Sequence, residues 1–337
     1  MKKCLSFDDV LLVPQHSEVT SRSKVVLGNR LGNFIFRFPI ISSPMDTVTE
    51  SDMCDAMNEA GGLGILHRYC SIEEQVEFAQ GKSYVYAAAI GVTGDYLERA
   101  QALFDAGIRI FCLDVAHGDH VYMRQAIEKI KENHGEFCSI MAGNVATLEA
   151  FNRLADWGAD AIRVGIGGGS ICSTRIQTGH GIPTFQSILD CAQSDRDAKI
   201  IADGGIRTSG DIVKAFAAGA DFAMLGSLLA GTDESPGEIF EGPWVGRKRG
   251  RYKIYRGMAS KEAQQDWRGR HSSNEGISTT VPYKGSVVPI LRDLDNGIRS
   301  GLSYSGAYTL PLLRSKAKFV CQTPAGQVES SSHIMRK

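Results

Sequence analysis

The sequence predicts a single-domain (β/α)8 TIM barrel, and two regularities support this fold class. Eight short apolar runs, rich in residues that favour β-strands, recur along the first two thirds of the chain. Most of them are followed by a segment with helical periodicity, at a repeat of roughly 22 to 28 residues. Alternating strands and helices build a parallel sheet, and eight such units close into a barrel, whereas an open doubly wound sheet usually has fewer strands.

The expected strands follow from their apolar, β-rich composition. They lie at Phe38–Ser42, Leu63–Leu66, Tyr84–Ile90, Ile110–Leu113, Ser139–Ala142, Ala161–Val164, Lys199–Ala202 and Phe222–Leu225. The clearest helical segments between them are 94–106, 121–131, 147–157 and 209–218. We expect one domain over residues 1–325 and a disordered tail at 326–337.

Composition and charge narrow the class of protein. Hydrophobic residues make up 43% and charged residues 22% of the chain, which is typical of a globular protein. A net charge of −1 provides no general field for nucleic acid or an acidic membrane, so we expect a small ligand held by local groups. The eight cysteines show no C-x-x-C spacing, and no apolar run could cross a bilayer. These features predict a cytoplasmic protein without a zinc site or disulfides.

Polar and glycine residues follow most of the expected strands where each strand ends. They include Asp46, Arg68, Asp114, Asn144, Gly165, the Asp203-Gly204-Gly205 run and the Gly226-Ser227 step. Any one of them could simply form a turn. Together they predict a functional site, because the carboxyl ends of barrel strands converge on one face, where active sites are built.

Two of these loops have the composition of a phosphate site. Glycines at 165, 167, 168 and 169 allow the backbone to approach a ligand closely, and Ser170 adds a hydroxyl donor. The steps at 204–205 and 226–227 fall in the seventh and eighth loops, the usual phosphate site of such barrels. The glycine loop could instead turn carbonyls toward a monovalent cation or serve only as a turn. We favour a phosphate-bearing ligand.

Cys172 is the candidate nucleophile. A lone cysteine is more often a small buried residue, but this one lies in the enlarged, glycine-rich loop 165–183 at the predicted catalytic face. The nearest candidates for proton transfer are Thr174, Arg175 and Glu275. Glu275 belongs to a second long polar segment, about 232–284, which is expected to form a mobile lid.

Seven motifs, in order, resemble the IMP dehydrogenase/GMP reductase family over residues from about 5 to 310. They are Phe7-Asp-Asp-Val-Leu-Leu, Met45-Asp-Thr-Val-Thr, Gly165-Ile-Gly-Gly-Gly-Ser-Ile-Cys-Ser-Thr-Arg, Ala202-Asp-Gly-Gly-Ile-Arg, Met224-Leu-Gly-Ser, Tyr255-Arg-Gly-Met and Val281-Pro-Tyr-Lys-Gly. The resemblance implies a barrel enzyme, a purine nucleotide substrate, a nicotinamide coenzyme as hydride partner and a homotetramer.

The resemblance also implies a role for each matching residue. Cys172 would add to the purine C2 atom and form a covalent thioimidate, with Thr174 and Glu275 as the other catalytic residues. The nucleotide would be bound by Ser170, Asp203, Gly204, Gly205, Gly226, Ser227, Gly257, Met258, Ser272 and Gly276. The coenzyme surface would comprise Ser21, Arg22, Arg68, Asp114, Val115, Ala116, Ile166, Gly167, Ser300 and Ser303, partly from a neighbouring subunit. Backbone carbonyls of Gly167, Gly169, Cys172 and Arg175 would match a potassium site.

Three features favour the reductase branch of the family. The two regulatory modules that dehydrogenases usually carry between the second and third barrel units have no room between Ser71 and Tyr84. We expect the lid to lack the Arg-Tyr pair by which dehydrogenase lids activate water, and Glu275 itself matches the reductase position that works with Thr174. The sequence therefore predicts a GMP reductase that converts GMP and NADPH to IMP, ammonia and NADP.

Other readings stay open at this point. The motif Ala116-His117-Gly118 is more similar to the dehydrogenase sequences of the family, so an IMP dehydrogenase without the regulatory modules is an alternative function. A barrel that binds a nucleotide without catalysis is a second alternative. Arg22 and Arg68 match positions that meet the 2′-phosphate of NADPH, although both could be solvated surface charges. Two positions depart from the family pattern. Gly168 stands where the family usually has proline, and Ser173 stands where it usually has threonine.

Overall fold

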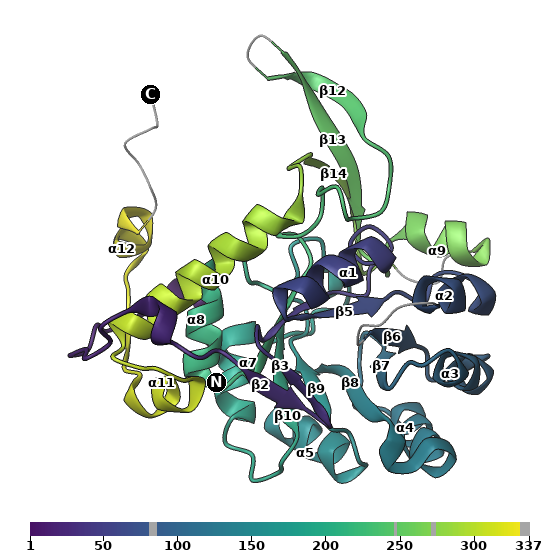
Figure 1. Cartoon of the computed structure of the whole chain (residues 1–337), viewed down its shortest axis with the longest axis horizontal. Helices are drawn as coiled ribbons and strands as arrows, with labels where there is room; N and C mark the ends of the chain where they lie inside the picture. Colours follow the sequence, from purple (N-terminus) through teal and green to yellow (C-terminus); the bar gives the residue numbers. More distant parts are fainter. Residues whose placement is uncertain (81–85, 246–247, 271–273, 331–337) are drawn as a thin grey trace.

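A computed structural model gives the fold and describes residues 1–80, 86–245, 248–270 and 274–330. Eight parallel strands close into a barrel in the order β10-β11-β4-β5-β6-β7-β8-β9 (Figure 1). They are β4 (Ile40–Ser42), β5 (Leu63–Leu66), β6 (Ala87–Ile90), β7 (Ile110–Asp114), β8 (Ser139–Val145), β9 (Ala161–Val164), β10 (Lys199–Asp203) and β11 (Phe222–Leu225). The predicted TIM barrel is confirmed, with each strand at the expected run.

Helices follow the strands and cover the outside of the barrel. They are α1 (Ser51–Ala60), α2 (Ile72–Ala79), α3 (Tyr96–Asp105), α4 (Val121–His134), α5 (Leu148–Asp156), α7 (Thr184–Cys191), α8 (Ser209–Ala218) and α10 (Val287–Tyr304). Several begin at a hydroxyl cap, such as Ser71 before α2 and Thr208 before α8, each of which accepts a backbone N–H of the first turn. None of the helices in the described parts of the chain is both long and apolar enough to span a bilayer.

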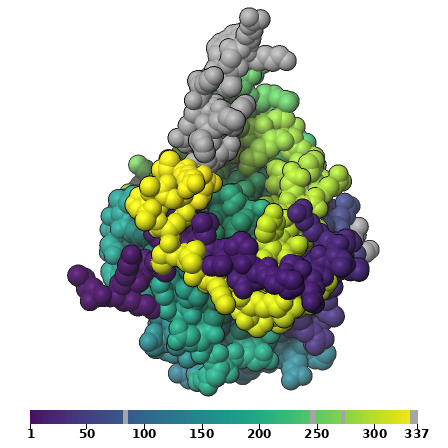
Figure 2. All heavy atoms as spheres, turned by 90° about the vertical axis from the view of Figure 1, so that its left-hand side faces the viewer, coloured from purple at the N-terminus to yellow at the C-terminus, as the bar shows by residue number. Residues whose placement is uncertain are grey.

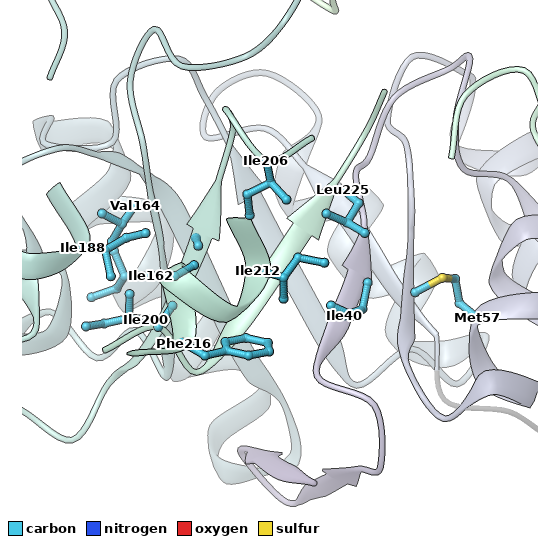
Figure 3. Packing of buried hydrophobic residues seen from close by; sticks show 14 of the residues in the cluster. Ile40, Met57, Ile162, Val164, Ile188, Ile200, Ile206, Ile212, Phe216 and Leu225 are labelled. Carbon is cyan, nitrogen blue, oxygen red and sulfur yellow. The ribbon is translucent and has the colours of Figure 1, made fainter. Parts of the chain in front are cut away.

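Two apolar layers hold the barrel together because side chains alternate along each strand. Phe222 and Met224 of β11 point into the barrel, whereas Ala223 and Leu225 face the helices. Figure 3 shows part of the outer layer, where Phe216 of α8 packs among the strands. The inner layer is closed at one end by the hairpin of β2 (Asn29–Leu31) and β3 (Phe34–Phe36), which contributes the buried side chains Leu31 and Phe36.

The segment expected as a mobile lid, about 232–284, has regular secondary structure. It contains the antiparallel sheet of β12 (Phe240–Val245), β13 (Lys248–Arg256) and β14 (Ser278–Pro282), and the helix α9 (Lys261–Arg268). The sheet projects away from the barrel, whereas α9 lies over its rim (Figure 1). This sheet was not expected from the sequence, because the buried positions of Tyr252–Arg256 are Lys253 and Tyr255 whereas Ile254 is exposed, so burial does not follow hydrophobicity.

The two ends of the chain meet on one face of the molecule. β1 (Val10–Leu12) pairs antiparallel with β15 (Phe319–Cys321), and Figure 2 shows the N-terminal and C-terminal segments side by side. Between α10 and β15 lies α11 (Leu310–Lys316). Disorder was expected from residue 326, but the short helix α12 (Pro324–Glu329) occupies the start of that tail, and residues 331–337 lie outside the described part.

Candidate active site

A polar layer lies on top of the apolar barrel interior at the carboxyl ends of four neighbouring strands. Residues two apart on a strand share a face. Inward-facing apolar residues of β7, β8, β9 and β10 are Cys112, Met141, Ala161 and Ile201. Two positions further along, on the same inward face, stand Asp114, Gly143, Arg163 and Asp203. Because side chains alternate along a strand, the charged side chains of Asp114, Arg163 and Asp203 lie together at the end of the barrel that opens to the catalytic face, as expected for this fold.

Arg163 is the centre of this layer and is only 7% exposed. Its guanidinium donates Nε and Nη2 to Asp203 Oδ2 over 3.1 and 2.9 Å, and Nη1 to Asp114 Oδ1. Burial would lower the pKa of Arg163, but the carboxylate of Asp203 and then that of Asp114 hold it well above its usual value. Burial would likewise raise the pKa of Asp114, yet Arg163 and Arg68 keep it below its usual range. Arg163 and Asp114 are therefore both charged at neutral pH.

Asp203 is oriented by a second donor. Asn144 donates its Nδ2 to Asp203 Oδ2 over 2.7 Å and to the carbonyl of Gly165 over 2.8 Å. The contacts of Arg163 also fall on Oδ2. The other carboxylate oxygen of Asp203 is thereby left toward the cavity, where a carboxylate can accept hydrogen bonds from vicinal hydroxyls.

Cys172 lies half-buried in the loop after β9. Its Sγ is 3.2 Å from Oγ1 of Thr174, the first residue of the short helix α6 (Thr174–Thr178). Burial raises the pKa of three other thiols, those of Cys70, Cys112 and Cys191, to about 12. Because the thiolate is the nucleophile, these three cysteines are inert, and Cys172 is the best placed for chemistry.

Glu275 reaches this loop through backbone pairing. The N–H of Ser173 donates to the carbonyl of Glu275 over 2.9 Å, and the N–H of Ile277 donates to the carbonyl of Ile171 over 3.0 Å. Oγ of Ser173 adds a bond to the carbonyl of Asn274 over 2.7 Å. Residues 274–277 thus form a short ladder with the catalytic loop. Glu275 and Cys172, which are far apart in the sequence, line the same cavity.

That cavity has a volume of about 410 Å³ and opens at the catalytic face. All three residues predicted as catalytic line it. So do the predicted substrate residues Ser170, Asp203, Gly204, Gly205, Gly226, Ser227, Gly257, Met258 and Gly276, and the predicted coenzyme residues Arg68, Asp114, Val115, Ala116, Ile166 and Gly167. Residues selected from seven separate stretches of sequence therefore surround one cavity.

Among the described residues, five predicted ones do not line the cavity: Ser21, Arg22, Arg175, Ser300 and Ser303. Ser21 and Arg22 begin a short 3-10 helix that packs against α10, the helix that carries Ser300 and Ser303. These four residues share one outer surface of the chain, away from Cys172. Ser272 lies outside the described residues.

The end of the cavity beside Ser170 suits a phosphate group. The buried hydroxyl of Tyr255 bonds the side chain of Ser170, and burial raises the pKa of this tyrosine. A side chain at Gly226 would approach the Tyr255 hydroxyl to 3.0 Å, so only glycine leaves this end open. Lys284 donates Nζ to the carbonyl of Ser227 over 2.8 Å and supports the loop after β11 from outside.

A second cavity of about 630 Å³ continues from the first. Arg68, Val115 and Arg268 line both cavities. Trp267 of α9 closes the second cavity, and its ring lies 6.1 Å from that of Tyr69. Together the two cavities give room for a ligand with two nucleotide halves in addition to a mononucleotide, so the residues present fit a dinucleotide coenzyme.

Arg163 and Tyr69 are among the lining residues that were not predicted from the sequence. Asn144 was expected as a polar residue at a strand end and Tyr255 as part of a motif, but neither had an assigned role. In the structure Arg163 and Asn144 hold Asp203, and Tyr255 bonds Ser170. One signal was available for Arg163, because it is a charged residue inside an otherwise apolar strand, Ala-Ile-Arg-Val. A buried charge of that kind needs partners, and partners at the end of a barrel strand point to a site.

An Arg-Tyr dipeptide does occur nearer the start of the lid, at Arg251-Tyr252 in β13. Its arginine stacks on the ring of Tyr283, 4.3 Å from the ring centre. Neither residue lines the cavity that holds Cys172. This pair is therefore not placed to activate a water molecule at the site.

The carbonyl groups expected to hold potassium fit that ion only in part. The carbonyl of Gly169 accepts the N–H of Cys172, and that of Arg175 accepts the N–H of Gly179, each over 3.1 Å. The side chain of Arg175 packs against Gly167, where a Cβ would lie 2.8 Å from its Nε, so a positive charge already lies against the loop. We derive no chemical step from a cation here.

Comparison with known proteins places this architecture in a family. The family model described as the IMP dehydrogenase / GMP reductase domain matches residues 4–333. The chain belongs to this IMP dehydrogenase/GMP reductase family. The resemblance inferred from the seven motifs is thereby confirmed over nearly the whole chain.

Members of both branches of the family are similar to this chain. It is 32% identical to an inosine-5′-monophosphate dehydrogenase of Nitrosopumilus maritimus, with 98% of each chain covered. It is also 32% identical to a GMP reductase of Leishmania major, with 99% of this chain and 97% of the relative covered. A crystal structure of a Trypanosoma brucei GMP reductase variant with guanosine 5′-monophosphate superposes with a TM-score of 0.93 at 30% identity, covering 99% of this chain and 98% of that one. Enzymes with these names are oxidoreductases that act on purine nucleotides.

The alignments also show a segment that this chain lacks. They run over 475 positions for the dehydrogenase and 483 for the Leishmania reductase, whereas this chain has 337 residues. Both relatives therefore carry inserted residues. Because relatives of both branches carry the insertion, its absence here does not indicate whether the chain is a reductase or a dehydrogenase. That distinction depends on the residues of the lid.

Proposed function

We propose that this family member is an NADPH-dependent GMP reductase. The overall reaction converts GMP, NADPH and two protons to IMP, ammonium and NADP. The observation that carries the proposal is the pairing of Ser173 with Glu275, which puts a carboxyl group and the hydroxyl of Thr174 beside the candidate nucleophile Cys172. A carboxyl group in that position can protonate a departing amine, whereas hydrolysis would need an activated water.

The nucleotide is held by the groups that surround the first cavity. The phosphate accepts hydrogen bonds from Ser170, Tyr255 and the backbone at Gly205 and Ser227. The ribose hydroxyls donate to the outward oxygen of Asp203, which Arg163 and Asn144 hold in place. This arrangement directs the purine toward Cys172.

The covalent step then follows from the positions of three side chains. The thiolate of Cys172 adds to C2 of GMP, and the C2 amino group leaves as ammonia after taking a proton that Thr174 and Glu275 pass to it. The thioimidate that remains keeps the C–S bond. A nicotinamide coenzyme held by the residues of the second cavity would supply the hydride for C2, and cleavage of the C–S bond would then release IMP and regenerate the thiolate of Cys172.

The coenzyme extends from this point into the second cavity. Arg68 lies at the junction of the two cavities and is proposed to contribute to NADPH recognition, together with Asp114, Val115 and Ala116. We propose that Ser21, Arg22, Ser300 and Ser303 complete the coenzyme surface of a neighbouring subunit in a homotetramer, since all four lie on one outer surface. The potassium site stays a prediction.

Product analysis tests this proposal. The enzyme is incubated with GMP and either NADPH or NADH, and IMP and ammonia are quantified by chromatography and an ammonia assay. We expect equal amounts of IMP and ammonia, with NADPH preferred. Formation of xanthosine monophosphate from IMP and NAD, with no IMP formed from GMP, would overturn it.

A dehydrogenase is the second candidate, and one observation favours it. Arg268 of the lid lines the same cavity as Cys172, so an arginine is available to activate water even though the Arg-Tyr pair is absent there. Replacing Arg268 by Gln separates the two functions. A reductase retains its deamination step in this variant, whereas a dehydrogenase loses hydrolysis and accumulates the covalent intermediate.

A further inference from the structure

Arg163 joins two parts of the site that the proposed function assigns to different ligands. It bonds Asp203, the residue proposed for the nucleotide ribose, and Asp114, which lies on the coenzyme side. Asp114 in turn faces Arg68, whose Nη2 donates to the Asp114 carbonyl over 3.1 Å. A continuous row of alternating charges, Asp203, Arg163, Asp114 and Arg68, therefore crosses the site from one cavity to the other.

The geometry of the strands makes this bridge possible. Arg163 is on β9 and Asp114 on β7, with β8 between them. In the register of the barrel, Gly143 of β8 stands between Asp114 on one side and Arg163 on the other. A Cβ at position 143 would lie 2.5 Å from Cβ of Arg163. Only glycine leaves room for the arginine to pass over β8 and reach Asp114.

Among the residues that the structure describes, Arg163 alone bonds the side chains of both carboxylates. A guanidinium has five N–H donors in a rigid plane, and this one uses Nε and Nη2 on Asp203 and Nη1 on Asp114. Buried carboxylates depend on such a partner, because an unpaired charge is costly away from water. If either carboxylate shifts, the guanidinium of Arg163 shifts with it, and the position of the other carboxylate changes as well.

We propose that Arg163 is a positioning residue that couples nucleotide binding to coenzyme binding, so that each ligand strengthens the binding of the other. Ribose hydroxyls that fix Asp203 also fix Arg163, which presents Asp114 to the coenzyme in its binding orientation. The inference rests on the proposed function for the identity of the ligands, but it does not depend on the direction of the reaction. Coupling of this kind is reciprocal by thermodynamic necessity.

The test uses a pair of ligands that cannot react on this enzyme, because IMP has no amino group to lose and NADPH cannot accept a hydride. Dissociation constants of IMP and of NADPH are measured by calorimetry, each alone and in the presence of saturating amounts of the other. In the natural enzyme we expect each ligand to tighten the other by about fivefold or more. A GMP reductase assay that fails would leave this measurement intact, so the two proposals can fail separately.

Two variants and one control complete the design. Arg163→Lys keeps the charge but cannot bridge both carboxylates, and Gly143→Ala displaces the Arg163 side chain while keeping every charged residue in the chain. In both, the coupling is expected to fall to about twofold or less. The control Asn144→Ala removes one donor to Asp203 and the bond to the Gly165 carbonyl but leaves the Arg163 bridge, so IMP should bind more weakly with the coupling retained.

A merely structural role for Arg163 predicts a different pattern. Both binary dissociation constants would then rise, with an unchanged ratio between the binary and ternary values. The proposal is overturned if the natural enzyme shows no coupling, or if Arg163→Lys or Gly143→Ala folds with a normal thermal midpoint and keeps the coupling. Should one of the two variants fail to fold, the other decides.

Discussion

Ser173 donates its backbone N–H to the carbonyl of Glu275 over 2.9 Å, and this bond ties the lid to the loop that carries the nucleophile. Because the bond uses only backbone atoms, it survives replacement of the Glu275 side chain. The chemistry of the carboxyl group can therefore be removed without detaching the lid.

Glu275→Gln is expected to lower kcat by about a hundredfold or more, since a positioned acid typically contributes this much. The amide keeps the shape of the side chain but cannot donate the proton that departing ammonia needs. Steady-state turnover with GMP and NADPH measures the effect. Glu262→Gln, at an exposed position in the first turn of α9, is the matched control and should leave turnover unchanged. Equal turnover in the two variants would exclude Glu275 as the acid.

Cys172→Ala is expected to abolish turnover, while GMP still binds within about tenfold of its natural affinity, because the phosphate and ribose contacts lie elsewhere. Calorimetry with GMP and a turnover assay check the two halves of this expectation. Cys321→Ser, at an exposed cysteine, serves as control. Residual turnover comparable to that of the control would contradict covalent catalysis.

Gly168 and Thr184 form a pair that explains one departure from the family. A Cβ at Gly168 would lie 2.3 Å from Oγ1 of Thr184, a buried hydroxyl with no hydrogen-bond partner among the described residues. Gly168→Ala should therefore cost about 1–3 kcal/mol of stability. The double variant with Thr184→Ala should recover part of that loss. Urea unfolding of the two single variants and the double variant measures the coupling, and additive losses would show that the two sites are independent.

Asp114 makes stability depend on acid pH. Its pKa is lowered in the folded protein because Arg163 and Arg68 outweigh the effect of burial. A group with a depressed folded pKa contributes stability above its unfolded pKa, near 3.8, and loses it as pH falls through the lower folded value. Asp114→Asn should thus destabilise the protein at pH 7 by on the order of 3 kcal/mol, and by less below the unfolded pKa. Urea unfolding of the natural protein and the variant, at pH 7 and at a pH below 3.8, measures this. A difference in unfolding free energy that is the same at the two pH values would contradict it.

Much of the fold was predictable because its signals are local. The apolar run at Ala161–Val164 and the helical period at 209–218 each reflect a single element, and both elements appear at those positions. The lid sheet was missed because Lys253 is buried and Ile254 exposed in Tyr252–Arg256, the reverse of what their hydrophobicity predicts. Its strands pair Tyr252 with both Phe240 and Pro282, and no local pattern specifies the register of strands so far apart in the sequence.

The site was predictable only in part, for a related reason. Cys172 and Asp203 could be predicted as site residues because they lie at the ends of barrel strands or in the loops that follow them. The role of Arg163 depends on Gly143 of the preceding strand and on Asp114 of the strand before that, and only the register of the three parallel strands brings these residues side by side. Likewise, Tyr255 reaches Ser170 from the lid sheet through tertiary packing that no spacing along the chain encodes.

The covalent adduct itself provides the most direct test of the account. The protein is mixed with GMP and oxidised NADP, quenched in acid and weighed as an intact chain, and the modified peptide is then sequenced. We expect a mass gain equal to GMP less ammonia, located on Cys172, with ammonia released in equal amount. No gain with GMP, together with the same adduct formed from IMP and NAD, would contradict the account and identify a dehydrogenase.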